Sequence, residues 1–134
     1  MPTLAKLPKG VQIPRICIFL HIPRTGGTTI RLVAEANLPE GQILPIYGPD
    51  IEHPEQALQR LHEPTRRALK MIRGHISFGI HRHLPWAECY YFTLVRNPME
   101  RVWSLWNYAY RHKTHHLYQA LRELGTIEAA VRSG

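Results

Sequence analysis

A short polar turn at Pro23–Thr29 has the composition of an anion-binding loop. It follows an apolar, β-prone run at Ile16–Leu20 and precedes helical spacing that starts at Ile30. Adjacent glycines allow a tight turn, and the unpaired N–H groups of a helix N-terminus attract negative charge. Arg24 adds a full cation. The pattern therefore predicts a cradle for phosphate or sulfate.

This turn differs from the nucleoside-triphosphate loop G-x-x-x-x-G-K-[ST]. Gly26 and Gly27 are adjacent, no lysine precedes Thr28, and the cation comes before the glycines. The residues therefore indicate another type of anion cradle. The alternative is a strand-to-helix turn that binds nothing.

A second candidate site combines Arg96 and Ser104. Arg96 ends the apolar run Tyr90–Val95, and Ser104 lies about two turns into the helix predicted from Pro98. Ligands of open parallel sheets bind beyond the carboxyl ends of the strands, and a guanidinium and a hydroxyl there can hold one phosphate. The alternative is an arginine at the sheet edge and a serine on a helix face.

His75 lies in a glycine-flanked turn after a short predicted strand that begins at Met71. Histidine is a residue type whose ordinary pKa suits general base catalysis. The alternative is a turn histidine that hydrogen-bonds to the backbone. No metal site is predicted, because His75, His81 and His83 lack cysteines or carboxylates at ligand spacing.

Other polar residues have supporting roles in this interpretation. We expect His21 to orient the cradle and Asn97 to shape the turn before the Pro98 helix. Arg101 either contacts a phosphate or pairs with a carboxylate. A solvated basic stretch is expected at His112, His115 and His116.

Strand and helix patterns alternate along the chain, which predicts an α/β fold with a central, mainly parallel sheet flanked by helices. Ile16–Leu20 and Tyr90–Val95 lack alternation, so both are predicted to be buried on both faces. Residues 1–14 form an irregular lead-in, and residues 15–134 form one domain. Further predicted elements are a helix at Ile30–Asn37, an extended piece at Ile43–Tyr47, a short helix around 57–61, a helix capped by Thr65, a helix from Pro98 to about Lys113, and two short helices separated at Gly125.

The composition is that of a globular protein with an anionic partner. Hydrophobic residues make up 44% of the 134 residues, and the net charge is +7. Cys17 and Cys89 are predicted to be small buried residues outside any disulfide framework. The sequence has no apolar run long enough to span a membrane and no signal peptide, so we expect a cytoplasmic protein.

Three segments together resemble a known family. HIPRTGGTT at 21–29, GHISFGIH at 74–81 and YFTLVRNPMERVWSLWNYAYRH at 91–112 are similar, in order and spacing, to sulfotransferases that use 3′-phosphoadenosine 5′-phosphosulfate (PAPS). The similarity is greatest to the branch with the heparan sulfate 2-O- and 6-O-sulfotransferases and bacterial relatives. It covers the chain from about Ile16 and corresponds to the amino-terminal half of a family domain, so we expect a domain truncated at its carboxyl end.

The resemblance implies a P-loop-like nucleotide-binding domain and a role for each motif. Arg96 and Ser104 correspond to the pair that holds the 3′-phosphate, and His75 corresponds to the general base. The residues of the 5′-phosphosulfate loop are Pro23, Arg24, Thr25, Gly26, Gly27, Thr28 and Thr29.

Two positions depart from the family pattern. Arg24 replaces the usual lysine, and because a guanidinium stays protonated, we assign it electrostatic stabilisation and not acid catalysis. Asn97 stands where aspartate is more common.

These residues lead to the hypothesis of sulfuryl transfer from PAPS to a hydroxyl acceptor, most readily a carbohydrate, with 3′-phosphoadenosine 5′-phosphate as the product. The main alternative is a non-catalytic nucleotide-binding or interaction fragment. A kinase-like enzyme is disfavoured by the absent G-K-[ST]. Nucleic acid is not expected as a partner, since only the positive charge favours it.

Overall fold

The computed structural model describes residues 14–133, which divide into two compact units. The first unit contains the chain up to His21 and Arg31–Thr93, and the second contains Ile22–Ile30 and the chain from Leu94 onward. Except for Pro14, the predicted lead-in at 1–14 lies outside the described residues.

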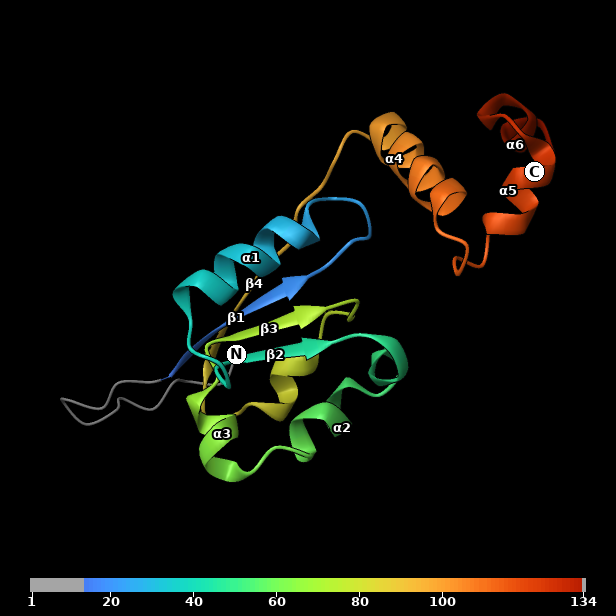
Figure 1. Cartoon of the computed structure of the whole chain (residues 1–134). Coiled ribbons are helices and arrows are strands. Elements are labelled where there is room, and N and C mark those ends of the chain that lie inside the picture. Colours follow the sequence, from blue (N-terminus) through green and yellow to red (C-terminus); the bar gives the residue numbers. More distant parts are fainter. Residues whose placement is uncertain (1–13, 134) are drawn as a thin grey trace. The chain divides into compact units, whose positions relative to one another are not determined.

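A four-stranded parallel sheet forms the centre of the first unit. Its order is β2 (Ile43–Ile46), β3 (Met71–Gly74), β1 (Arg15–Leu20) and β4 (Glu88–Phe92). All strand pairs are parallel, so their carboxyl ends meet at one edge (Figure 1). The predicted α/β class with a parallel sheet is confirmed.

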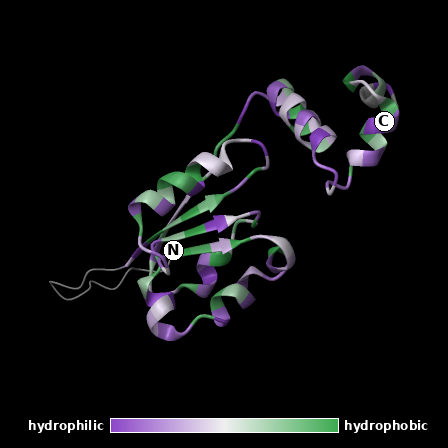
Figure 2. Ribbon diagram, in the orientation of Figure 1, coloured by the Kyte–Doolittle hydropathy of each residue, from purple (hydrophilic) through white to green (hydrophobic). Residues whose placement is uncertain are grey.

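Helices cover both faces of this sheet. Helix α1 (Gly27–Asn37) lies on one face, while α2 (Pro54–Gln59) and α3 (Glu63–Ala68) lie on the other (Figure 1). Two short 3-10 helices complete the unit, η1 (Gly48–Ile51) and η2 (Ile80–His83). The strands and α1 are also among the more hydrophobic segments in Figure 2.

The main core lies on the α2 and α3 side of the sheet. Ile16 and Ile18 of β1 and Ile72 of β3 are fully buried there. Residues from the covering segments pack against them, namely Ala57, Leu58, Leu69, Ile76, Ile80 and Leu84. This alternation of buried residues fixes the register of β1, because a shift of one residue would expose its isoleucines.

The described residues cover the other face of the sheet, on the α1 side, only in part. Two predictions are therefore wrong: that both apolar strands are buried on both faces, and that both cysteines are buried. Phe19 is fully buried, but Cys17 is exposed, so β1 is not buried on both faces. Cys89 is half-buried, and both thiols are free. In β4, exposed and half-buried residues alternate because it is an edge strand of the described sheet.

Several predicted boundaries shift in the structure. The fourth strand is Glu88–Phe92 and not Tyr90–Val95, because its pairing with β1 starts at Glu88. Helix α1 begins at Gly27 and not Ile30. Helix α3 begins at Glu63, so Thr65 lies inside the helix and the predicted Thr65 cap is wrong.

The second unit is mostly helical. Its longest helix is α4 (Pro98–Arg111), followed by α5 (Tyr118–Leu124) and α6 (Ile127–Ser133). Asn97 caps α4, since its Oδ1 accepts hydrogen bonds from the N–H groups of Met99 and Glu100. The predicted turn role of Asn97 and the break at Gly125 are confirmed.

None of the helices within 14–133 combines the length and apolar character needed to cross a membrane. The same residues contain no group of three or more potential metal-ligating side chains.

Candidate functional site

The predicted anion loop and helix α4 meet at Arg24. Arg24 Nε donates a hydrogen bond to Ser104 Oγ, 3.1 Å away, although the two residues are 80 positions apart. The same guanidinium lies over the ring of Tyr108, 4.6 Å from its centroid. We call these three residues the arginine clasp. It unites two motifs that the sequence predicted separately.

Further bonds hold the loop in place beside the clasp. Arg101 Nε donates to the carbonyl oxygen of Pro23 at 3.0 Å, and Thr25 Oγ1 donates to the carbonyl oxygen of Ile22 at 2.7 Å. Arg101 therefore fastens the loop, a role that sequence reasoning missed. Arg24 itself has a φ of 68°, a left-handed conformation that is unfavourable for a residue with a side chain.

The N-terminus of α1 supplies further hydrogen-bond donors. The first bond of this helix runs from the N–H of Ile30 to the carbonyl of Gly26. The N–H groups of Gly27, Thr28 and Thr29 precede it and have no helical acceptor. Together with Arg24 they form a positively polarised turn, the electrostatic environment that a phosphate or sulfate needs.

The Ser104 hydroxyl can still donate a hydrogen bond while its oxygen accepts one from Arg24. A guanidinium can only donate, so Ser104 Oγ is the acceptor of the bond from Arg24. The hydroxyl proton of Ser104 is then available for an anion. The side chains of Arg24 and Ser104 can therefore both donate to the same oxyanion.

Arg96 is not part of these contacts. Its Nε lies 3.2 Å from Glu100 Oε2 in an exposed ion pair near the start of α4. No hydrogen bond joins Arg96 to Ser104 within the part of the chain that the structure describes. β4 ends at Phe92, so the prediction that Arg96 directly ends a buried strand is wrong.

A second cluster lies in the first unit, at the carboxyl ends of three neighbouring strands. His21 follows β1, Tyr47 follows β2 and His75 follows β3. His21 Nδ1 is 3.1 Å from Tyr47 Oη, and His75 Nδ1 is 2.8 Å from the carbonyl oxygen of His21. The imidazole rings stack with centroids 4.5 Å apart, and Tyr47 meets both rings edge-on. We call these three residues the histidine cluster.

The buried side chain of Arg73 contacts the histidine cluster through Tyr47. Arg73 Nη1 lies 3.4 Å from Tyr47 Oη, and Arg73 Nη2 lies 3.3 Å from Glu35 Oε1. Only 10% of the Arg73 side chain is exposed, against 44% for Glu35. Burial lowers the pKa of His21, and the nearby His75 and Arg73 lower it further. All three effects favour the neutral form of His21.

The backbone contact of His75 has a chemical consequence. A carbonyl oxygen can only accept, so His75 Nδ1 carries the proton in its bond to His21. In the neutral ring, Nε2 then has the free lone pair, which a general base requires. The two interpretations of His75, a backbone-bonded turn residue and a base, are thus compatible.

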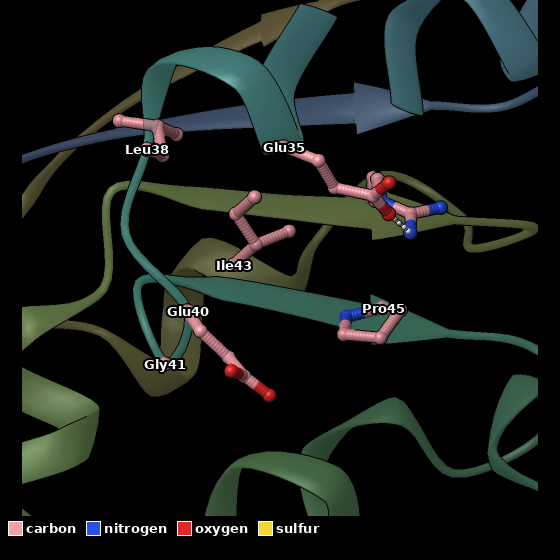
Figure 3. Close-up of a pocket in the computed structure, with 7 residues that line it drawn as sticks. Glu35, Leu38, Glu40, Gly41, Ile43 and Pro45 are labelled. Carbon is pink, nitrogen blue, oxygen red and sulfur yellow. Dashed lines mark hydrogen bonds and ion pairs between the residues drawn. The ribbon is translucent and has the colours of Figure 1, made fainter. Parts of the chain in front are cut away.

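A pocket of about 460 Å³, which Arg73 helps to line, lies against β2 (Figure 3). Leu38, Ile43 and Pro45 form its apolar wall, with Glu35, Glu40, Gly41 and Arg73 completing the lining. The Glu35 carboxylate forms an ion pair with the guanidinium of Arg73, with Oε1 and Nη2 3.3 Å apart. Arg73 therefore links the pocket to the histidine cluster.

Sequence reasoning missed Tyr47, Arg73 and Glu35. For Tyr47 a signal existed, since it is the last residue of the extended piece predicted at Ile43–Tyr47 and so lies at a predicted strand end, as His21 and His75 do. For Arg73 and Glu35 the contact depends on α1 crossing β3, which no local pattern reveals. His81, which was considered above only as a possible metal ligand, lies with Nδ1 2.9 Å from Tyr91 Oη. This contact anchors the loop after β3.

Comparison with protein-family models, with curated proteins and with solved structures finds no significant match to this chain. The functional interpretation therefore depends on the motifs and on the geometry of the arginine clasp and the histidine cluster.

Proposed function

We propose that this chain is a PAPS-dependent sulfotransferase that transfers a sulfuryl group to a hydroxyl, with a carbohydrate as the acceptor. Arg24 and the turn from Pro23 to Thr29 bind the 5′-phosphosulfate. The resemblance pairs Ser104 with Arg96 at the 3′-phosphate, but because Ser104 contacts Arg24 we assign its hydroxyl to the 5′-phosphosulfate instead. Arg96 binds the 3′-phosphate, which requires it to leave the exposed ion pair with Glu100. His75 is the general base.

The contact between Arg24 and Ser104 carries this proposal. It joins a cation, a hydroxyl donor and the N-terminal N–H groups of α1 within one compact unit. Such donors stabilise the negative charge that develops on the leaving phosphate during group transfer. Arg24 acts as a permanent cation here, because a guanidinium group stays protonated.

In the proposed reaction, PAPS supplies the sulfuryl group, the acceptor supplies the hydroxyl, and His75 takes the proton. The acceptor hydroxyl gives its proton to His75 Nε2, and its oxygen forms a new bond to sulfur. The bond between sulfur and the phosphate oxygen breaks, and the electron pair stays on the 3′-phosphoadenosine 5′-phosphate that leaves.

The test is transfer of labelled sulfate from PAPS to a panel of polysaccharides, including desulfated heparin. His75→Ala should lower the rate roughly 10²- to 10⁴-fold, because the base is lost, while cofactor affinity stays unchanged. His83→Ala, which changes an exposed histidine of η2, is the matched control and should transfer normally. Equal rates for the two variants would contradict the role of His75.

A non-catalytic binding fragment is the second candidate. The observation that favours it is the exposed apolar surface of the second unit, where Val95, Met99 and Trp103 are 81%, 76% and 54% exposed. Cofactor binding without transfer to any member of the panel would support this candidate.

A further inference from the structure

The two imidazole rings of the histidine cluster differ in which nitrogen carries the proton. Tyr47 Oη lies within reach of Arg73, which can only donate, so the tyrosine oxygen accepts this bond. Tyr47 Oη keeps its own proton to donate, and within residues 14–133 its other hydrogen-bond partner is His21 Nδ1, 3.1 Å away, so the proton is assigned to that bond. His21 Nδ1 is therefore an acceptor, and the proton of neutral His21 lies on Nε2.

His75 has the opposite arrangement. Its Nδ1 donates to the backbone carbonyl of His21, which leaves a lone pair on Nε2. Within residues 14–133, neither Nε2 atom has a hydrogen-bond partner. The stacked rings thus present one free donor, on His21, and one free acceptor, on His75.

We propose that His21 and His75 together form a binding site for a vicinal diol, as found in carbohydrates. The reacting hydroxyl donates to His75 Nε2, and the neighbouring oxygen accepts a hydrogen bond from His21 Nε2–H. His21 is thereby a substrate-contacting residue and not merely a support for the anion loop. The transfer step rests on the proposed function, whereas the diol site does not.

The surroundings of His21 stabilise the required state. Burial, His75 and Arg73 all lower the pKa of His21, which keeps it neutral. Tyr47 donates to it, Phe19 stacks on it at 5.5 Å, and Glu35 faces Arg73 on the far side. A neutral ring with its proton on Nε2 is the form that can donate to an uncharged oxygen.

The first test is long-range ¹H–¹⁵N NMR of the imidazoles at about pH 7.5, where neutral histidine dominates. We expect the Nε2–H tautomer for His21 and the Nδ1–H tautomer for His75. In Tyr47→Phe, His21 should lose its preference while His75 keeps its own. The reverse assignment for either ring in the wild-type protein would overturn the proposal.

The second test is an NMR titration of the same rings with cis-cyclohexane-1,2-diol and with cyclohexanol. The diol should bind about fivefold more tightly, the effect of one additional hydrogen bond. His21→Gln, which retains an amide donor, should keep this preference, and His21→Leu should lose it. Equal binding of the two alcohols by the wild-type chain would overturn the proposal.

These tests need no sulfuryl donor. Failure to bind 3′-phosphoadenosine 5′-phosphate would refute the proposed function and leave the diol site intact. Equal binding of the two alcohols together with normal cofactor binding would refute the diol site and leave the proposed function intact.

Discussion

At the scale of single residues, the chemistry depends on how shared hydrogen bonds direct protons. Arg24 makes Ser104 Oγ an acceptor and so frees the serine proton for an anion. Tyr47 Oη accepts from Arg73, and the tyrosine proton is assigned to His21 Nδ1, its other partner among the described residues. In both cases an arginine, which can only donate, determines what its neighbour can do.

Ser104→Ala tests the arginine clasp. Loss of a hydrogen bond to a charged ligand should weaken binding of 3′-phosphoadenosine 5′-phosphate about tenfold, measured by calorimetry. Ser77→Ala is the matched control, because Ser77 is exposed and lies in the first unit. Unchanged affinity in Ser104→Ala would remove Ser104 from the anion site.

The lowered pKa of His21 predicts a pH dependence of stability. Below its ordinary pKa of 6.5 the unfolded chain binds a proton that the folded chain resists, so the free energy of unfolding should fall as the pH drops below 6.5. The pKa of His115 is also lowered and acts in the same direction. In urea unfolding at several pH values, the free energy of unfolding should therefore fall less at acid pH for His21→Gln than for the wild-type protein. An identical fall in the two proteins would contradict the account.

At the scale of elements, the sequence patterns predicted where the strands lie better than they predicted which faces of the strands are buried. The apolar runs located β1 and β4, but continuous apolar character did not mean burial on both faces. Cys17 and Tyr90 are exposed because the described helices do not cover that part of the sheet. The sequence predicted the role of Asn97 because that role depends only on neighbouring residues: its side chain caps the helix that it precedes.

Asn97→Ala should destabilise the protein through α4. The substitution leaves the N–H groups of Met99 and Glu100 without their acceptor and should lower the free energy of unfolding by about 1 kcal/mol. Asn97→Asp keeps the acceptor and should retain nearly full stability in the same urea titration. A destabilised Asp variant would show that the cap is not the cause.

Gly74 allows β2 and β3 to approach each other closely. A Cβ at this position would lie 1.9 Å from the carbonyl oxygen of Ile46, so Gly74→Ala should cost roughly 3–5 kcal/mol of unfolding free energy. Gly41→Ala is the comparison, since it meets no atom within 4 Å and only its φ of 86° opposes the change. It should cost about 1 kcal/mol, and similar losses for both would contradict the steric explanation.

At the scale of the whole molecule, positive charge is concentrated in the unit that contains the arginine clasp. Residues 22–30 and 94–134 carry seven lysines or arginines against three acidic residues. This balance favours an anionic ligand there. The single domain predicted over residues 15–134, the cofactor and the acceptor class stay predictions.

The sequence located the candidate site in part. It predicted the anion loop, Ser104 and His75 from residue type and spacing, and the structure connects the loop to Ser104. It could not show that Arg101 fastens the loop or that Tyr47 and Arg73 support the histidines, because these contacts join distant segments. Such contacts depend on tertiary packing, which local patterns do not encode.

The most direct measurement is a calorimetric titration of the chain with 3′-phosphoadenosine 5′-phosphate and, separately, with ATP. An anion site that also binds a 3′-phosphate should favour the former by about tenfold or more, since ATP lacks that group and its charge-assisted hydrogen bonds. Equal affinities, or tighter binding of ATP, would contradict the proposed function.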